Sequence, residues 1–129
     1  MKLLLDTHAF LWWDADAEQL PESLLGILQD PAHEVTLSVV SAWEMQIKAA
    51  LGKLELRTPL ATLISEQREK NGLGVLPVSL QHVLALEELG DYHKDPFDRL
   101  LIAQAKVEGL TLVSKDEVFR HYDVPLLWE

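Results

Sequence analysis

Short runs of aliphatic and β-branched residues alternate along this chain with longer segments of helical periodicity. Leu3–Leu5 has the pattern of a buried strand and ends at Asp6, and similar runs recur at residues 35–40, 75–78 and 110–114. Alternation of this kind predicts a mostly parallel sheet with helices on both faces. We therefore expect an α/β fold, a three-layer α/β/α sandwich around a central parallel sheet of four to five strands with right-handed crossovers.

Capping residues and helix breakers mark the helical segments between these strands. They are expected at about residues 7–13, 21–28, 41–52, 58–70, 79–90, 95–109 and 117–122. Ser41, Thr58, Ser79 and Asp95 are the predicted N-caps, because each is a short polar residue just before a helical pattern. With 129 residues and no repeat or long linker, the chain is expected to form a single domain, residues 1–129.

The composition narrows the classes of function. Acidic residues number 21 against 11 basic ones, and the net charge of −10 argues against a broad basic face for nucleic acid. A nuclease is not excluded, because a carboxylate cluster that binds divalent cations adds negative charge of its own. The absence of cysteine excludes disulfides, thiolate metal sites and cysteine nucleophiles. No apolar run is long enough for a signal peptide or a membrane span, so a cytoplasmic protein without membrane association is expected.

Four carboxylates occupy positions that a parallel sheet brings together. They are Asp6 at the end of the first strand, Glu44 in the helical turn after the second, Asp98 in the first turn of its helix, and Asp116 after the fourth strand. The carboxyl ends of parallel strands and the N-termini of the following helices share one edge, where ligands bind. We therefore expect three of these acids to meet there, joined by Asp98 if its helix begins at the same edge.

Clustered carboxylates repel one another unless a cation neutralises them. The five histidines show no metal-ligand spacing, although His93 is near the predicted site, so the available ligands are hard oxygens. Such ligands favour Mg²⁺, with Mn²⁺ as an alternative, over Zn²⁺. A metal of this kind suits hydrolysis of a phosphodiester bond.

Each acid also has a structural interpretation. Ser41 and Glu44 have the spacing of a capping box, Asp98 lies where a helix dipole favours an acid, and Asp116 can start a turn. Asp6, directly after a buried apolar strand, is the hardest to explain without a functional partner. The convergence of all four on one edge favours a functional site.

Four sequence blocks, in order, resemble the PIN-domain nucleases, specifically the VapC-like toxins of type II toxin–antitoxin systems. The blocks are Leu5 to Trp13 with Asp6-Thr7-His8, residues 38–48 with Trp43-Glu44, His93 to Ala105 with Asp-Pro-Phe-Asp, and Leu112 to Asp116. The resemblance spans nearly the whole chain, and the third block is its most specific part.

The resemblance implies an activity, residue roles and partners. The activity is that of a Mg²⁺-dependent endoribonuclease, in which a metal-activated water cleaves RNA. The family's catalytic and metal-binding acids correspond to Asp6, Glu44, Asp98 and Asp116. The supporting positions are Thr7, Asp95, Ser114 and Arg99. The implied partners are an RNA substrate, a cognate antitoxin protein that covers the site, and a second copy of the chain in a homodimer.

Three other functions compete with this one. A catalytically silent PIN-fold module that binds RNA or protein is the main alternative, and the presence of all four acids argues against it. A haloacid-dehalogenase-like phosphatase would need a second acid two residues after Asp6, where His8 stands. A receiver-like domain would need an aspartate at the end of the third strand, which ends instead in Val78-Ser79.

Several other side chains near the predicted site have two interpretations. Trp12 and Trp13 point to different sides of their helix, and both are predicted to be core residues; the alternative for one is to stack on a base or contact an antitoxin helix. Lys48, Lys94 and Lys115 are near enough to contact phosphate, and Arg99 could do so or pair with an acid.

Overall fold

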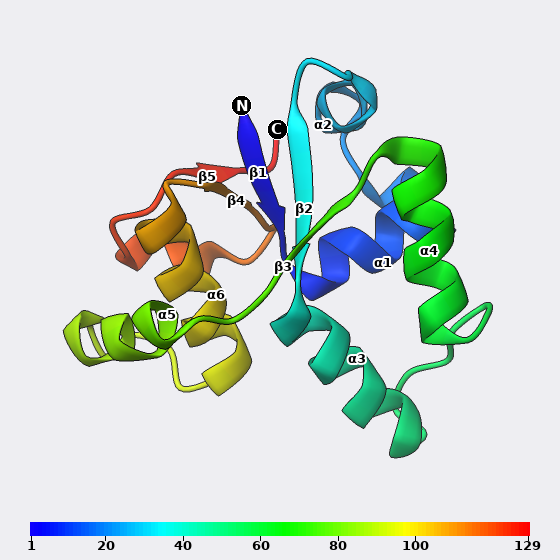
Figure 1. The fold of residues 1–129 in the computed structure, drawn as a ribbon. Coiled ribbons are helices and arrows are strands. Elements are labelled where there is room, and N and C mark those ends of the chain that lie inside the picture. Colours follow the sequence, from blue (N-terminus) through cyan, green and yellow to red (C-terminus); the bar gives the residue numbers. More distant parts are fainter.

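A computed structural model describes all of residues 1–129 and contains a five-stranded parallel sheet (Figure 1). In sheet order the strands are β3 (Gly74–Leu76), β2 (Glu34–Ser38), β1 (Lys2–Leu5), β4 (Thr111–Val113) and β5 (Leu126–Leu127). Every neighbouring pair is parallel, and Leu3 of β1 lies opposite Val35 on one side and Thr111 on the other. The predicted α/β fold with a central parallel sheet is confirmed.

Helices connect all of the strands. α1 (Thr7–Ala15), η1 (Ala17–Gln19) and α2 (Glu22–Gln29) join β1 to β2, and α3 (Val39–Ala50) and α4 (Leu60–Asn71) join β2 to β3. α5 (Leu80–Ala85), η2 (Leu86–Glu88) and α6 (Pro96–Glu108) join β3 to β4, and η3 (Glu117–His121) joins β4 to β5. α4 and α6 end, as predicted, at glycines, Gly72 and Gly109, whose φ angles of 66° and 67° are left-handed.

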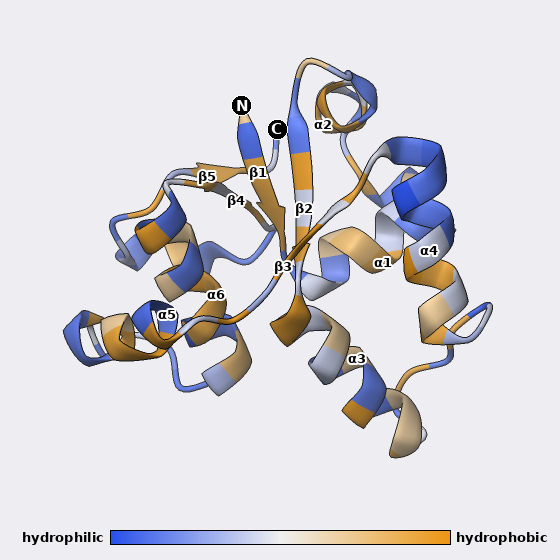
Figure 2. Cartoon of the chain, viewed as in Figure 1, coloured by the Kyte–Doolittle hydropathy of each residue, from blue (hydrophilic) through white to orange (hydrophobic).

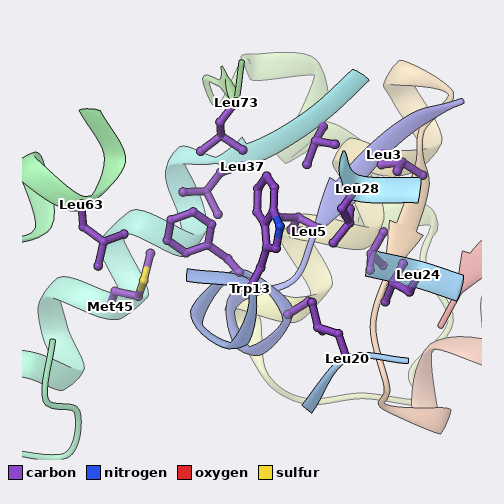
Figure 3. Close-up of a cluster of buried hydrophobic side chains, with 14 residues drawn as sticks. Leu3, Leu5, Trp13, Leu20, Leu24, Leu28, Leu37, Met45, Leu63 and Leu73 are labelled. Carbon is purple, nitrogen blue, oxygen red and sulfur yellow. The ribbon is translucent and has the colours of Figure 1, made fainter. Parts of the chain in front are cut away.

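Alternate residues of the strands enter two apolar cores, one on each face of the sheet. Leu3 and Leu5 point toward α1, α2 and α4 and join a cluster of 14 buried residues, in which Trp13 lies as predicted (Figure 3). Leu4 points toward α6 and η3 and joins a second cluster of nine. Figure 2 shows hydrophobic residues along the central strands and both hydrophobic and hydrophilic residues on the surrounding helices. The two-residue period of a strand thus produces the three layers.

The helix after β2 begins earlier than predicted. β2 ends at Ser38 rather than at residue 40, and Ser38 instead of Ser41 caps α3 by accepting a hydrogen bond from Val40 N–H at 3.0 Å. The Ser38 hydroxyl also donates to buried Gln104 of α6 at 2.5 Å. This contact is tertiary, so no local pattern reveals it. Ser41 lies inside the first turn, where its buried hydroxyl has no hydrogen-bond partner.

Other predicted boundaries also need correction. Thr58 does not cap α4; Pro59 occupies the N-cap position, and the Thr58 hydroxyl contacts the Pro59 carbonyl at 3.4 Å. β3 ends at Leu76 instead of Val78, because Pro77 has no N–H for a ladder hydrogen bond. The caps predicted at Ser79 and Asp95 are confirmed.

The carboxyl ends of β1, β2 and β4 lie at one edge of the sheet, where the next elements begin. α1 starts two residues after β1 ends, and α3 starts directly after β2. In Figure 1 the first turns of these two helices lie close together below the strands. None of the helices has the length and apolar character that crossing a bilayer requires.

Candidate active site

Four carboxylates and one imidazole meet at this edge of the sheet. Ligand atoms of His93, Asp98 and Asp116 all lie within 4.8 Å of one another. Asp6 is close enough to feel the charge of Asp116, and Asp98 feels the charge of Glu44. The structure therefore brings together all four acids singled out from the sequence.

Asp6 is buried at the end of β1, with 7% of its surface exposed. Its Oδ1 accepts a hydrogen bond from Ala9 N–H at 2.8 Å and thereby caps α1. Burial raises the pKa of this carboxyl, with a smaller contribution from the Asp116 charge, whereas Ser114, the Ala9 N–H and His8 oppose the rise. Asp6 therefore caps a helix, a structural role that the sequence pattern did not predict. Its Oδ2 does not take part in the cap.

Glu44 lies buried between two hydrogen-bond donors. Thr7 Oγ1 donates to Oε1 at 2.5 Å, and Lys48 Nζ donates to Oε2 at 2.8 Å. The hydrogen bond that Lys48 donates to Glu44 raises the pKa of the Lys48 ammonium, and the charges of Glu44, Asp95 and Asp98 add to this effect. Lys48 therefore faces the acidic cluster and offsets part of its charge.

The capping box predicted for Ser41 and Glu44 is absent. Because Ser38 caps α3, Glu44 lies beyond the first turn and makes no hydrogen bond to a backbone N–H. Its carboxylate is held entirely by side chains of α1 and its own helix, Thr7 and Lys48. Helix capping therefore does not explain why an acid occupies this buried position.

Asp98 and His93 form the more exposed part of the site. His93 Nε2 lies 2.7 Å from Asp98 Oδ2, and the two side chains are 21% and 23% exposed. Burial raises the pKa of Asp98 to about 6; the Asp95 and Glu44 charges add to the rise, and His93 opposes it. The Asp98 carboxylate accepts no backbone N–H, so it remains available to a ligand.

A network around Tyr122 fixes the loop that carries His93. The Tyr122 hydroxyl accepts hydrogen bonds from the N–H groups of Tyr92 and His93 at 3.2 and 2.8 Å. Arg99 Nη1 donates to the carbonyls of Gly90 and His93 at 2.9 and 3.2 Å. Arg99 thus positions the loop, and the expectation that it could pair with an acid is not met.

Asp95 and Asp116 each cap a helix at the rim of the site. Asp95 Oδ1 accepts from Phe97 N–H at 2.8 Å, at the start of α6. Asp116 Oδ1 accepts from Val118 N–H at 3.0 Å, at the start of η3. Ser114 Oγ accepts from the Asp116 N–H at 3.0 Å, which holds the turn after β4 in place.

The donor set fits a divalent cation. The carboxylates of Asp6 and Asp98 have raised pKa values, chiefly because burial disfavours their charges, and a bound cation would relieve this cost. Lys48 supplies one positive charge to the cluster, which is fewer than the acids it faces. Mostly hard oxygens with one imidazole match Mg²⁺ or Mn²⁺ better than a thiolate-binding metal.

Sequence reasoning missed the parts played by His93 and Lys48. The sequence does not predict His93 as a metal ligand, because no second histidine lies at metal-binding spacing from it. The signal was its position five residues before Asp98, since a loop that turns into a helix brings both side chains to the helix start. Lys48 is one helical turn after Glu44, a spacing that favours an ion pair.

The fold and the site together define a class of protein. A family model described as the PIN domain matches residues 3–125 of the chain. This chain belongs to the PIN-domain family.

Individual proteins and solved structures are also similar to this chain. It is 27% identical over 124 residues to Ribonuclease VapC22 of Mycobacterium tuberculosis, and the match covers 95% of this chain and 93% of that protein. The fold is similar to VapBC2 from Rickettsia felis bound to a DNA fragment from its promoter, with a TM-score of 0.76, 17% identity and complete coverage of both chains. It is also similar to VapBC-5 from Mycobacterium tuberculosis, a member of the VapBC family of toxin–antitoxin systems, with a TM-score of 0.56 and 19% identity over 93% of this chain and 89% of that one.

Proposed function

We propose that this chain is a metal-dependent endoribonuclease, the toxin of a type II toxin–antitoxin system, acting as one nuclease domain over residues 1–129. The observation that carries the proposal is the convergence of Asp6, Glu44, Asp98 and Asp116 at the carboxyl edge of a PIN-type sheet. The similarity to Ribonuclease VapC22 and to VapBC-5 supports both the RNA substrate and the protein partner.

In this proposal Asp6, Glu44, Asp98 and Asp116 would hold a Mg²⁺ or Mn²⁺ ion, with His93 beside them. When bound, such a cation supplies a water of lowered pKa and stabilises negative charge on a phosphodiester. Burial is the main reason why the pKa of Asp98 is raised to about 6, and a bound cation would relieve this cost.

The remaining residues orient this set. Thr7 and Lys48 fix both oxygens of Glu44, so the carboxylate cannot turn away from the site. Ser114 holds the turn that positions Asp116, and Arg99 holds the loop that positions His93. Water attacks the scissile phosphorus in line while the P–O3′ bond breaks, so one product carries a 5′-phosphate and the other a 3′-hydroxyl.

Two protein contacts belong to the same proposal. A cognate antitoxin keeps the nuclease silent by covering the acidic edge, and a second copy of the chain forms a homodimer. Size-exclusion chromatography with light scattering, on the chain alone and after co-expression with the protein encoded beside it, tests both. If the chain is a monomer and does not bind this protein, both proposed contacts are contradicted. The nuclease proposal is not affected by that result.

Purified protein is incubated with total cellular RNA, with and without Mg²⁺ or Mn²⁺, and the fragment ends are mapped. We expect discrete metal-dependent cuts that are lost in Asp6→Asn and Asp98→Asn. Asp91→Asn, an exposed acid outside the cluster, is the matched control and keeps full activity. Absence of cleavage by a folded protein that still binds metal and RNA would favour the catalytically silent binding module.

A further inference from the structure

Three aromatic rings lie beside the acids, at the same edge of the sheet. Trp12 of α1 meets Trp128, which follows β5, edge to face with ring centroids 5.8 Å apart. His8 is tilted against Trp12 at 5.9 Å. Ser114 N–H donates to the Leu127 carbonyl at 3.2 Å, so Trp128 is level with the turn that carries the last acid. The rings therefore continue the surface of the candidate active site.

A cavity of about 560 Å³ opens next to these rings. Its lining includes Ser114, Lys115, Arg120 and Trp128, together with the acids Glu117 and Glu129. This volume is within the range of pockets that hold nucleotide-sized ligands. Ser114 lines the cavity and its side chain also hydrogen-bonds Asp6, so the cavity and the acidic site share this residue.

One cation of this cavity is free to meet a ligand. Arg120 pairs with Glu117, so these two charges cancel. Lys115 forms no ion pair, and its Nζ lies 6.0 Å from the centroid of the Trp12 ring. Lys115 and Trp128 both line the cavity, so an unpaired ammonium and an indole are available there to the two chemical parts of a nucleotide, its phosphate and its base.

The charge of the chain explains why an aromatic contact matters here. With a net charge of −10 and a cluster of acids at the site, the protein repels the phosphates of a nucleic acid. Stacking of a base on an indole does not depend on that charge and tolerates any base. Affinity for RNA can therefore come from this surface where electrostatics oppose it.

We propose that this cavity binds one unpaired nucleotide of the substrate, with its base stacked on Trp128 and a phosphate held by Lys115. Trp12 contacts the Trp128 ring edge to face and helps to fix its position. A base inside a duplex has both faces covered by its neighbours, so the nucleotide held here is an unpaired one. The inference rests on the proposed action on RNA and adds the place where one nucleotide is held.

The test measures binding by fluorescence anisotropy, with a labelled unpaired oligoribonucleotide and the same strand in a duplex. An Asp98→Asn background prevents cleavage during the measurement. We expect the single strand to bind more tightly, Trp128→Leu to weaken it about tenfold, and Trp128→Phe to retain most of the affinity. Leu84→Ala, at a leucine 55% exposed on α5 and outside the cavity lining, is the control and leaves binding unchanged.

Lys115→Gln gives an independent readout that does not disturb the packing of Trp128. It is expected to weaken binding about threefold and to reduce the slope of log Kd against log salt by roughly 0.7, whereas Trp128→Leu leaves the slope unchanged. Unchanged single-strand affinity in both variants, or equal loss for single strand and duplex, would overturn the inference.

The outcomes separate this inference from the proposed function. Cleavage that persists with normal RNA binding in both variants keeps the nuclease and overturns the nucleotide subsite. RNA binding that depends on Trp128, in a protein that never cuts, keeps the subsite and removes the nuclease. Thermal unfolding of each variant is recorded alongside; if Trp128→Leu does not fold, Trp128→Phe and Lys115→Gln decide.

Discussion

The two halves of the acidic site are built differently. In the half formed by α1 and α3, Glu44 is buried and both of its oxygens have side-chain donors. In the half formed by α6 and η3, Asp98 is partly exposed, hydrogen-bonds only to His93, and has its pKa raised to about 6 by burial above all. Glu44 is satisfied without any ligand and Asp98 is not. The difference indicates a preformed frame beside a part that responds to metal.

The largest expected effect tests the responsive half directly. Asp98→Asn removes a charge but keeps the shape of the side chain, so RNA cleavage should fall by about 100-fold or more while the fold persists. The rate is measured in Mn²⁺ on a mapped substrate, and the unfolding temperature is recorded beside it. Retained cleavage would place the metal-dependent step in the other half.

The frame is broken by Thr7→Val, which removes the hydroxyl that donates to Glu44. A buried carboxylate then lacks one donor, and the free energy of unfolding should fall by about 2 kcal/mol in urea titrations. Thr7→Ser restores the bond and most of the stability. Thr62→Val, at an exposed position of α4, is the control and should change little. If Thr7→Val is as stable as the control, the frame is not held by this bond.

Substitutions of His93 test whether its imidazole binds the metal or only orients Asp98. His93→Ala should lower the affinity for Mn²⁺ about tenfold in calorimetric titrations. His93→Asn can still hydrogen-bond Asp98 but offers no imidazole nitrogen. Recovery of affinity in His93→Asn would show an orienting role, and continued loss would show a ligand. A loss larger for Mn²⁺ than for Mg²⁺ also indicates a ligand, since Mg²⁺ prefers oxygen.

The smallest effect is a dependence of stability on pH. The pKa values of Asp98 and Asp6 are raised mainly by burial, so between about pH 4 and the folded-state values the folded protein binds more protons than the unfolded chain. Its stability then falls as the pH rises through about 6, on the order of 1 kcal/mol for a partly exposed group such as Asp98. Melting curves at pH 5 and 7.5, without metal, should show this decrease.

Two further measurements, one with Mn²⁺ and one on Asp98→Asn, show which groups cause this decrease in stability. Mn²⁺ should abolish it at pH 7.5, because a bound cation stabilises the charged carboxylates. Asp98→Asn should reduce it, because one of the titrating groups is gone. Equal stability of the metal-free protein at both pH values would contradict the interpretation that burial disfavours the charged form of Asp98.

Strand-and-helix alternation was sufficient to predict the layers and the edge where the acids meet. Leu3, Leu4 and Leu5 face opposite cores because a strand has a period of two, and that rule needs only sequence. The local structure around Glu44 was not predictable in this way. The choice of Ser38 over Ser41 as cap depends on Gln104, a residue 66 positions away in the chain. Sequence patterns within one helix cannot detect such a partner.

The place of His93 has a similar origin. Its loop is fixed by Tyr122 and Arg99, which come from separate elements and use backbone groups as partners. Backbone partners leave no trace in residue type, so the loop path could not be inferred. For Asp6 the sequence analysis favoured a functional role and missed a structural one, because this residue also caps α1.

The capping bonds of Asp6 and Asp116 have a consequence for how such a chain diverges. Both residues begin a helical segment, so a copy released from selection for catalysis would still lose stability on losing either one. Asp98 makes no bond of that kind, and drift would remove it first. Among descendants of this protein, retention of Asp98 therefore reports preserved activity, whereas retention of Asp6 and Asp116 reports only a preserved fold.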